Sequence, residues 1–533
     1  MGVNREPQAG AYRASSSTGS GDSNQPIADI LVIGGGINGV GIARDAAGRG
    51  LDVVLCEKDD LAQHTSSSST KLIHGGLRYL EHYEFLLVRH ALKEREVLLK
   101  SAPHIIWPLR FLLPHHRALR PLWLIRLGLF LYDHIGGRQL LPASRGIDLR
   151  RHVGGQALKP EFTRGFEYSD CWVQDSRLVV LNARDAQARG AQILTRTQCT
   201  GLRREADHWQ AMLCDSRDGR TYTIRARAIV NATGPWVEQT RGFDDRVDSD
   251  GSIRLIKGSH IVVPKLFEHR FSYIFQHADN RVIFAIPYEN DFTLLGTTDI
   301  EISGDPDHVR IDDAEVAYIC DAVNQYFQTR VSPEDVIWSY SGVRPLFDDQ
   351  SKNASRVTRD YVLQIDDDGP PILSVFGGKI TTYRKLSEQA VDRLKKPLGF
   401  DACHWTAGAT LPGGEIPDKN FEQFLVRCKQ TYPWLEDSLL TDYARNYGSD
   451  IKQLLLDCDQ MKDLGQHFGG NLFEAEVDYL MTHEWAETSA DVLWRRTKKG
   501  LHAPAGTENK LQQWMNARQT RSGQIRRLKV LDL

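Results

Sequence analysis

The chain has 533 residues, of which 41% are hydrophobic and 25% are charged, and its formal net charge is −3. This composition is typical of a globular protein with a sizeable core and two or three domains. The near-neutral charge gives no overall attraction to nucleic acid, so we expect no nucleic-acid partner. The eight cysteines are scattered without a C-x-x-C pair. We therefore expect neither a disulfide framework nor a bound metal, and a reducing compartment.

The first segment, residues 1–26, is rich in Ser, Gly, Asn and Gln and has no apolar run. It lacks the apolar core of a signal peptide and is predicted to be a disordered tail outside the fold. No uninterrupted apolar stretch in the sequence reaches the length that spans a bilayer.

The folded part is predicted to begin with an apolar strand at 28–33, followed by a glycine turn and a helix. The turn reads G-x-G-x-x-G, and an acid follows the next apolar run. Such glycines let backbone N–H groups approach a pyrophosphate, and the acid can accept hydrogen bonds from a ribose. We predict a dinucleotide site rather than a simple turn between strand and helix. Its candidate residues are Gly34, Gly36, Asn38, Gly39 and Glu57.

A hydroxyl-rich run at 66–70 comes next, and a pair of glycines follows it. The run could be a flexible loop, but its place after Glu57 favours bonds to the pyrophosphate and ring edge of a cofactor. The candidate cofactor-binding residues of this segment are Ser67, Ser68, Thr70, Lys71, Gly75 and Gly76.

The stretch 97–132 contains no Asp or Glu and sets arginines among Trp and Leu side chains. Prolines break it into short pieces. Cations beside Trp and Leu suit a segment lying on an anionic membrane surface. The alternative is that the apolar residues are core and the arginines a solvated edge, and the residues alone do not decide between the two.

Two further strands end in small-residue turns, at 225–236 and 372–384. Three such units spread over some 350 residues indicate FAD, whose two halves need separate segments, rather than NAD. Between about 253 and 343, short branched runs predict a separate sheet that covers the flavin. After about 411, the spacing of apolar residues predicts helices. The further cofactor candidates in these turns are Ala232, Gly234, Gly378 and Thr381.

These motifs, in this order, resemble the bacterial aerobic glycerol-3-phosphate dehydrogenases. The resemblance rests on the glycine turn at 34–39, the run at 66–80, Lys257–His260, Gly296–Asp299, Ser341–Pro345 and Phe376–Lys379. It implies an α/β fold: a Rossmann-like FAD-binding domain with an interleaved β-rich substrate domain, as in D-amino-acid oxidase, over 27–410, and a C-terminal helical domain over 411–533.

The resemblance also implies the chemistry: oxidation of sn-glycerol 3-phosphate to dihydroxyacetone phosphate, with electrons passed through FAD to ubiquinone or another quinone. The protein would then be peripheral, on the cytoplasmic face of the inner membrane, and a homodimer is left open.

The candidate base is His260, because imidazole titrates near working pH, although a lone histidine is more often structural. By resemblance, His260 and Arg344 are catalytic, and the phosphate is bound by Arg78, Tyr79, Arg359 and Lys379. Three alternatives remain: an oxidase that passes electrons to O₂, an amine or amino-acid oxidase, and a flavoprotein without turnover. The cations after the glycine turns count against an amine substrate.

Overall fold

The computed structural model describes residues 26–116, 119–244, 246, 253–276, 281–348 and 360–531, with side chains up to 520. The predicted tail up to residue 25, Arg117 and Arg359 lie outside the described residues. The chain divides into two compact units. One comprises Met1–Ser101 with Ile106–Thr410, and the other Ala102–Ile105 with Leu411–Leu533.

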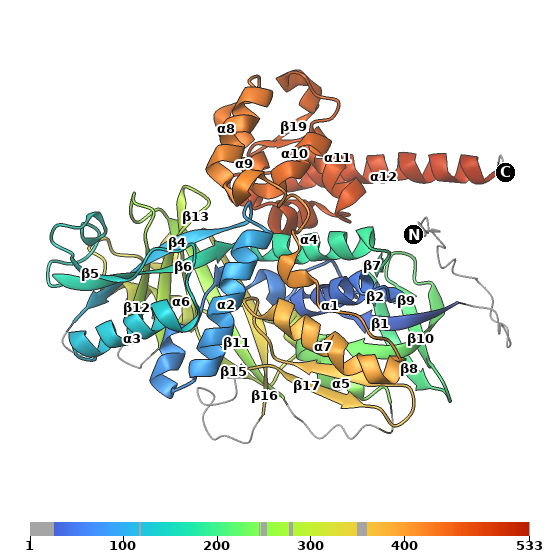
Figure 1. Cartoon of the computed structure of the whole chain (residues 1–533). Helices are drawn as coiled ribbons and strands as arrows, with labels where there is room; N and C mark the ends of the chain where they lie inside the picture. Colours follow the sequence, from blue (N-terminus) through green and yellow to red (C-terminus); the bar gives the residue numbers. More distant parts are fainter. Residues whose placement is uncertain are drawn as a thin grey trace. The chain divides into compact units, whose positions relative to one another are not determined.

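A largely parallel sheet carries the nucleotide-binding turns of the first unit (Figure 1). Its strand order is β17-β18-β10-β1-β2-β7, and β8 and β9 extend it through β10. The central strand β1 pairs in parallel with β2 and β10 and is almost entirely buried, as its apolar run predicts. The strands are β1 (Ile27–Ile33), β2 (Val53–Cys56), β7 (Gln192–Leu194), β8 (Thr197–Arg204), β9 (Trp209–Asp215), β10 (Thr221–Asn231), β17 (Val362–Asp366) and β18 (Ile372–Phe376).

Helix α1 (Ile37–Gly48) contacts α4 (Asp175–Ala188) and α7 (Tyr383–Leu398) in the same unit. Its start is held at the carboxyl end of β1 by the glycine turn. Parallel β1, β10 and β18 therefore deliver their three turns to one edge of the sheet.

A second sheet of ten strands has the order β15-β11-β14-β13-β12-β4-β6-β3, with β16 on β11 and β5 on β6. The predicted sheet at about 253–343 is part of it, but four strands from earlier in the chain extend it. Its members are β3 (Leu72–Ile73), β4 (Ile106–His115), β5 (Arg145–Asp148), β6 (Arg164–Val173), β11 (Ile253–Pro264), β12 (Ser272–Gln276), β13 (Val282–Tyr288), β14 (Phe292–Gly296), β15 (Ile300–Ile302) and β16 (Trp338–Phe347).

The chain crosses between these sheets repeatedly: β1–β2, β7–β10 and β17–β18 lie in the first, β3–β6 and β11–β16 in the second. Helix α6 (Asp313–Asn324) packs on β11, β13 and β14. This arrangement confirms the predicted α/β fold with an interleaved β-rich part.

The acid-free stretch 97–132 has two different environments. It covers the end of α2 (Phe85–Ser101), the strand β4 and most of α3 (Leu122–Ile135). On β4, Phe111 and Leu112 are fully buried, so for this part the core alternative is correct. On α3, by contrast, Trp123 is 68% exposed. Among the described residues, no helix combines the length and hydropathy needed to cross a bilayer.

The second unit is mainly helical, as predicted for the C-terminal domain. Its core includes Leu439, Tyr443, Leu480 and Val492. The carboxylate of Asp491 accepts a hydrogen bond from the backbone N–H of Thr488 (2.9 Å). Its elements are α8 (Phe421–Thr431), α9 (Asp437–Tyr447), α10 (Ile451–Leu454), β19 (His467–Gly469), β20 (Leu472–Phe473), α11 (Glu474–His483) and α12 (Thr507–Leu531).

Candidate active site

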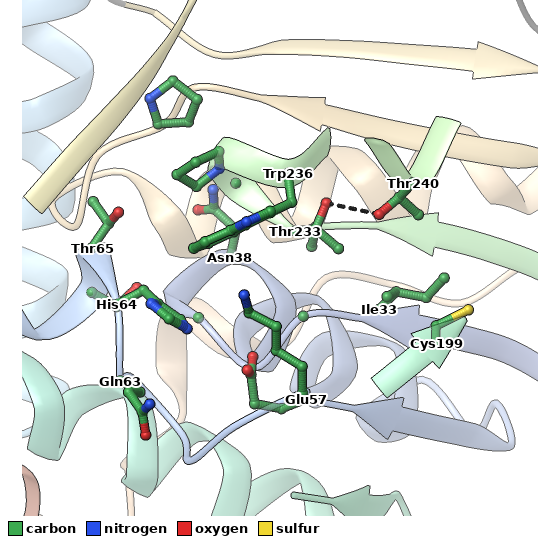
Figure 2. A pocket seen from close by; sticks show the side chains of 18 of the residues that line it. Ile33, Asn38, Glu57, Gln63, His64, Thr65, Cys199, Thr233, Trp236 and Thr240 are labelled. Atoms are coloured by element: carbon green, nitrogen blue, oxygen red, sulfur yellow. Dashed lines mark hydrogen bonds between the residues drawn. The ribbon is translucent and has the colours of Figure 1, made fainter. Parts of the chain in front are cut away.

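A cavity of about 220 Å³ lies where β1, β2 and β10 end and α1 begins (Figure 2). Gly34 has φ +110°, and a Cβ there would lie 2.6 Å from the carbonyl oxygen of Ala232. A Cβ at Gly39 would overlap the carbonyl oxygen of Gly34. Only glycine permits this turn. The predicted residues that line the cavity are Gly34, Gly36, Asn38, Glu57, Ala232, Gly234 and Gly378.

Glu57 is held in place by two backbone donors. Its carboxylate accepts from the N–H of Gly35 at 2.6 Å and of Asp59 at 2.9 Å. Burial raises the pKa of Glu57, and the two N–H groups oppose that rise by stabilising the charged form. Figure 2 shows the side chain pointing into the cavity, where a carboxylate can accept hydrogen bonds from ribose hydroxyls.

Asn38 joins two of the three turns. Its Nδ2 donates to the carbonyl oxygen of Gly377 at 3.1 Å. Its Oδ1 is buried without a hydrogen-bond partner among the described residues. Because buried polar atoms are seldom left unpaired, this oxygen is available to a donor on a bound molecule.

A second, larger cavity of about 830 Å³ adjoins the first, and the two share the lining residues Ile37, Thr65, Ser66, Pro345 and Gly378. The first lies at a helix N-terminus suited to a pyrophosphate. The second reaches the other sheet. Two connected cavities of this kind fit a cofactor with a nucleotide half and a ring half.

The hydroxyl-rich run lies along both cavities. Ser66 Oγ accepts from the N–H of Ile37 at 3.0 Å, and Ser68 and Thr70 line the larger cavity. Ser67 and Lys71, which were also predicted to touch the cofactor, line neither. Lys71 is buried, and its Nζ lies 2.9 Å from an Asp175 carboxylate oxygen.

His260 lies on β11, opposite Gly296 on β14 and Tyr340 on β16. Its ring stacks on Tyr340 with centroids 4.9 Å apart, and its Nε2 is 3.0 Å from Thr70 Oγ1. Its Nδ1 has no hydrogen-bond partner among the described residues. The side chain lines the larger cavity yet is only 2% exposed.

Burial sets the charge of His260. Burial lowers its pKa well below the ordinary value near 6.5, and the positive charges of Lys71 and Arg344 lower it further. The imidazole is therefore neutral at neutral pH, the form that can accept a proton.

Arg344, on β16, lines the same cavity as His260. Its Nη2 lies 2.7 Å from an Asp299 carboxylate oxygen and donates to the carbonyl oxygen of Thr298 at 2.9 Å. These contacts fix the guanidinium at the cavity wall, and Asp299 partly balances its charge.

The predicted phosphate-binding residues come from two segments that meet at the larger cavity. Arg78 and Tyr79 belong to the short helix Leu77–His82, and Lys379 follows the turn after β18. The Lys379 Nζ lies 4.1 Å from the centroid of the Tyr79 ring. Thr381 also lines this cavity.

Gly39, Gly75 and Gly76 line neither cavity and instead allow close packing. The N–H of Gly75 donates to the hydroxyl of Tyr132 at 2.7 Å. Gly76 has φ +73°, and a Cβ there would overlap the Tyr79 ring.

Several lining residues were not predicted. Some adjoin or lie in predicted motifs, so their sequence position was a usable signal: Lys58, Thr65, Trp236, Thr297 and Asp299. Others lie apart from every predicted site motif and carry no such signal: Thr197, Gln198, Cys199, Arg120 and Arg281.

Comparison with known proteins gives two family matches. Residues 29–384 match the FAD dependent oxidoreductase family, and residues 404–519 match the C-terminal domain of alpha-glycerophosphate oxidase. The chain is 53% identical to a D-erythritol 1-phosphate dehydrogenase of Brucella abortus, over 92% of this chain and 97% of the relative. It is also 53% identical to a glycerol-3-phosphate dehydrogenase of Pseudomonas aeruginosa, over 92% of this chain and 95% of the relative.

A solved structure is also similar: the glycerol-3-phosphate dehydrogenase of Bacillus halodurans complexed with FAD. It superposes with a TM-score of 0.71 at 28% identity, covering 89% of this chain and 86% of that one. The cofactor is FAD, which the two adjoining cavities fit. The protein belongs to the FAD-dependent oxidoreductase family, in the group of the glycerol-3-phosphate dehydrogenases.

Proposed function

We propose that the protein oxidises sn-glycerol 3-phosphate to dihydroxyacetone phosphate. The observation that carries this proposal is the convergence of a neutral buried histidine, His260, with the cations Arg78 and Lys379 on one cavity. That cavity adjoins the nucleotide site. The proposal is also supported by a relative that is named glycerol-3-phosphate dehydrogenase and shares about half of its residues with this chain.

Bound FAD supplies the acceptor for the hydride that leaves the carbon bearing the hydroxyl group. His260 accepts the hydroxyl proton as the carbon–oxygen double bond forms. Its unpartnered Nδ1 and its Nε2, near Thr70, are the two atoms that can do so. Arg344 provides a fixed positive charge for the oxygen as negative charge develops on it.

The phosphate group would be bound by Arg78, Tyr79, Arg359 and Lys379. Arginine can hold two phosphate oxygens at once, and lysine contributes a point charge. The contact of Lys379 with the Tyr79 ring keeps two of these groups close together before substrate arrives.

For the second half-reaction we propose a membrane quinone as the electron acceptor. Helix α3 supports this, because Trp123, Leu127 and Phe130 are 68%, 48% and 50% exposed and share one face of the helix. Tyr83, just before α2, and Leu86, in the first turn of α2, are exposed as well, and α2 contacts α3. Such a surface suits peripheral attachment at the cytoplasmic face of the membrane.

A four-carbon polyol phosphate is a second candidate substrate. The relative named D-erythritol 1-phosphate dehydrogenase is as similar to this chain as a named glycerol-3-phosphate dehydrogenase.

Anaerobic mixing of the purified holoenzyme with each substrate tests both candidates. Bleaching of the flavin absorbance by sn-glycerol 3-phosphate establishes the reductive half-reaction. Faster bleaching by D-erythritol 1-phosphate would favour the second candidate, and no bleaching by either would contradict both. Adding a quinone analogue or O₂ to the reduced enzyme then separates a dehydrogenase from an oxidase.

A further inference from the structure

Four side chains from three separate segments meet at the mouth of the smaller cavity. Lys58 follows Glu57 at the end of β2, and His64 lies in the loop after it. Trp236 ends the turn after β10. Asp307 belongs to the short helix Pro306–His308, which follows β15 of the second sheet. All four line the cavity.

The indole of Trp236 contacts a cation and an imidazole. The Lys58 Nζ lies 3.9 Å from the centroid of the indole, and the His64 ring lies 4.7 Å away, edge to face. Figure 2 shows the indole extending over the cavity toward His64, above Glu57. A flat ring held in this way can cover a bound nucleotide.

Lys58 also links the two sheets. Its Nζ donates to both carboxylate oxygens of Asp307, at 2.5 and 2.7 Å. The side chains are 25% and 35% exposed, so water and salt reach this ion pair. An ion pair with that exposure contributes little to the stability of a fold. It can, however, break and re-form readily, as a closure over a bound cofactor must.

We propose that Lys58, His64, Trp236 and Asp307 form a clasp, a set of contacts that closes over the nucleotide half of FAD and retains it. The Lys58–Asp307 ion pair holds the clasp closed. Opening the clasp separates the loop after β2 from the loop after β15 and frees the path over Trp236. The clasp does not depend on which substrate is oxidised, because it acts on the cofactor alone.

The test is the rate at which FAD leaves the purified holoenzyme after dilution, followed by the rise in free-flavin fluorescence. Asp307→Asn removes the ion pair at nearly constant side-chain size, and release should become up to about fivefold faster, the range expected for a solvent-accessible ion pair. Salt should accelerate release from the wild type but much less from Asp307→Asn, because salt weakens the intact ion pair.

Three variants keep the test decisive. Asp307→Glu preserves the charge and should restore slow release. Glu301→Gln breaks the comparable Arg254–Glu301 ion pair of β15, outside both cavities, and should leave release unchanged. Lys58→Met removes the ion pair together with the cation–π contact, so adding Asp307→Asn to Lys58→Met should accelerate release no further. Unchanged release from Asp307→Asn, or additive effects in the double variant, would overturn the clasp.

Discussion

At the scale of single residues, the environment of His260 determines what it can do. Tyr340 fixes the plane of its ring, and Thr70 contacts its Nε2. Burial and two neighbouring cations keep it neutral. None of these partners is adjacent to it in the sequence, so the motif around His260 indicated a candidate base but not its charge state.

Replacing His260 with alanine should slow flavin reduction by glycerol 3-phosphate roughly 10²–10⁴-fold, the usual contribution of a general base. FAD should be retained, because His260 lies outside the smaller cavity, which binds the nucleotide half of the cofactor. Anaerobic stopped-flow absorbance measures the rate, and the flavin-to-protein ratio is the control. Near-normal reduction with stoichiometric FAD would remove His260 from the mechanism.

The pH dependence follows from the same environment. A base works only when it is unprotonated, and the pKa of His260 lies well below 6.5. At saturating substrate, the rate of flavin reduction should therefore stay level as pH falls through 6.5 and drop only at lower pH. An acidic limb centred at or above pH 6.5 would show that another group is the base.

Removing one phosphate contact should weaken substrate binding selectively. A hydrogen bond to a charged group is worth about 1.5–3 kcal/mol, so Lys379→Ala and Arg359→Ala should each raise KM for glycerol 3-phosphate about ten- to a hundredfold. The ratio of kcat/KM for glycerol 3-phosphate to kcat/KM for glycerol should therefore fall. Lys385→Ala, on α7 and outside both cavities, is the matched control. Wild-type KM in both variants would place the phosphate elsewhere.

Side-chain direction limited what the sequence could predict about the site. The glycine positions followed from the motif, because a turn of that shape requires them. The position of Lys71 could not be predicted in this way: Lys71 directly follows the hydroxyl-rich run, but its side chain pairs with Asp175, 104 residues later. Trp236, two residues after Gly234, was within reach of sequence reasoning, whereas Cys199 enters only because β8 folds beside the cavity.

At the scale of elements, the stretch 97–132 shows why apolar composition alone is ambiguous. The same mixture of arginine and large apolar residues forms an interior strand in β4 and an exposed helix in α3. Pairing decides between them: β4 is hydrogen-bonded to β6 along its whole length. That long-range pairing has no local signal. In α3, Arg126 Nη1 donates to Ser144 Oγ at 2.9 Å, so Arg126 also makes a structural contact within the unit.

The exposed face of α3 is therefore the sharper test of membrane attachment. Replacing Trp123, Leu127 and Phe130 together with glutamine should weaken sedimentation with anionic liposomes at least about tenfold, because burying one such side chain is worth about 1.5–3 kcal/mol. Quinone reduction should slow, while flavin reduction by substrate should persist. The matched control replaces three exposed apolar residues elsewhere, Met212, Val426 and Leu456. Equal binding by both variants would contradict attachment through α3.

At the scale of the whole molecule, the interleaved topology gathers the cofactor site from distant parts of one unit. The cavities draw on turns after β1, β10 and β18 and on β16 of the other sheet, so these segments must all be in place before FAD can bind. The order of motifs was enough to predict this arrangement in outline. The extent of the second sheet was not predictable, because β3, β4, β5 and β6 join it across long sequence separations.

Because every residue lining the two cavities belongs to the first compact unit, FAD should stabilise the two units unequally. Free FAD at a hundred times its dissociation constant adds about 2.7 kcal/mol to the stability of the part that binds it. In calorimetry of the full chain, removing FAD should lower the transition of the first unit by a few degrees. The transition of residues 411–533 should stay in place. A single transition that shifts as a whole would show that the units unfold together, so that binding at the cavities stabilises the entire chain.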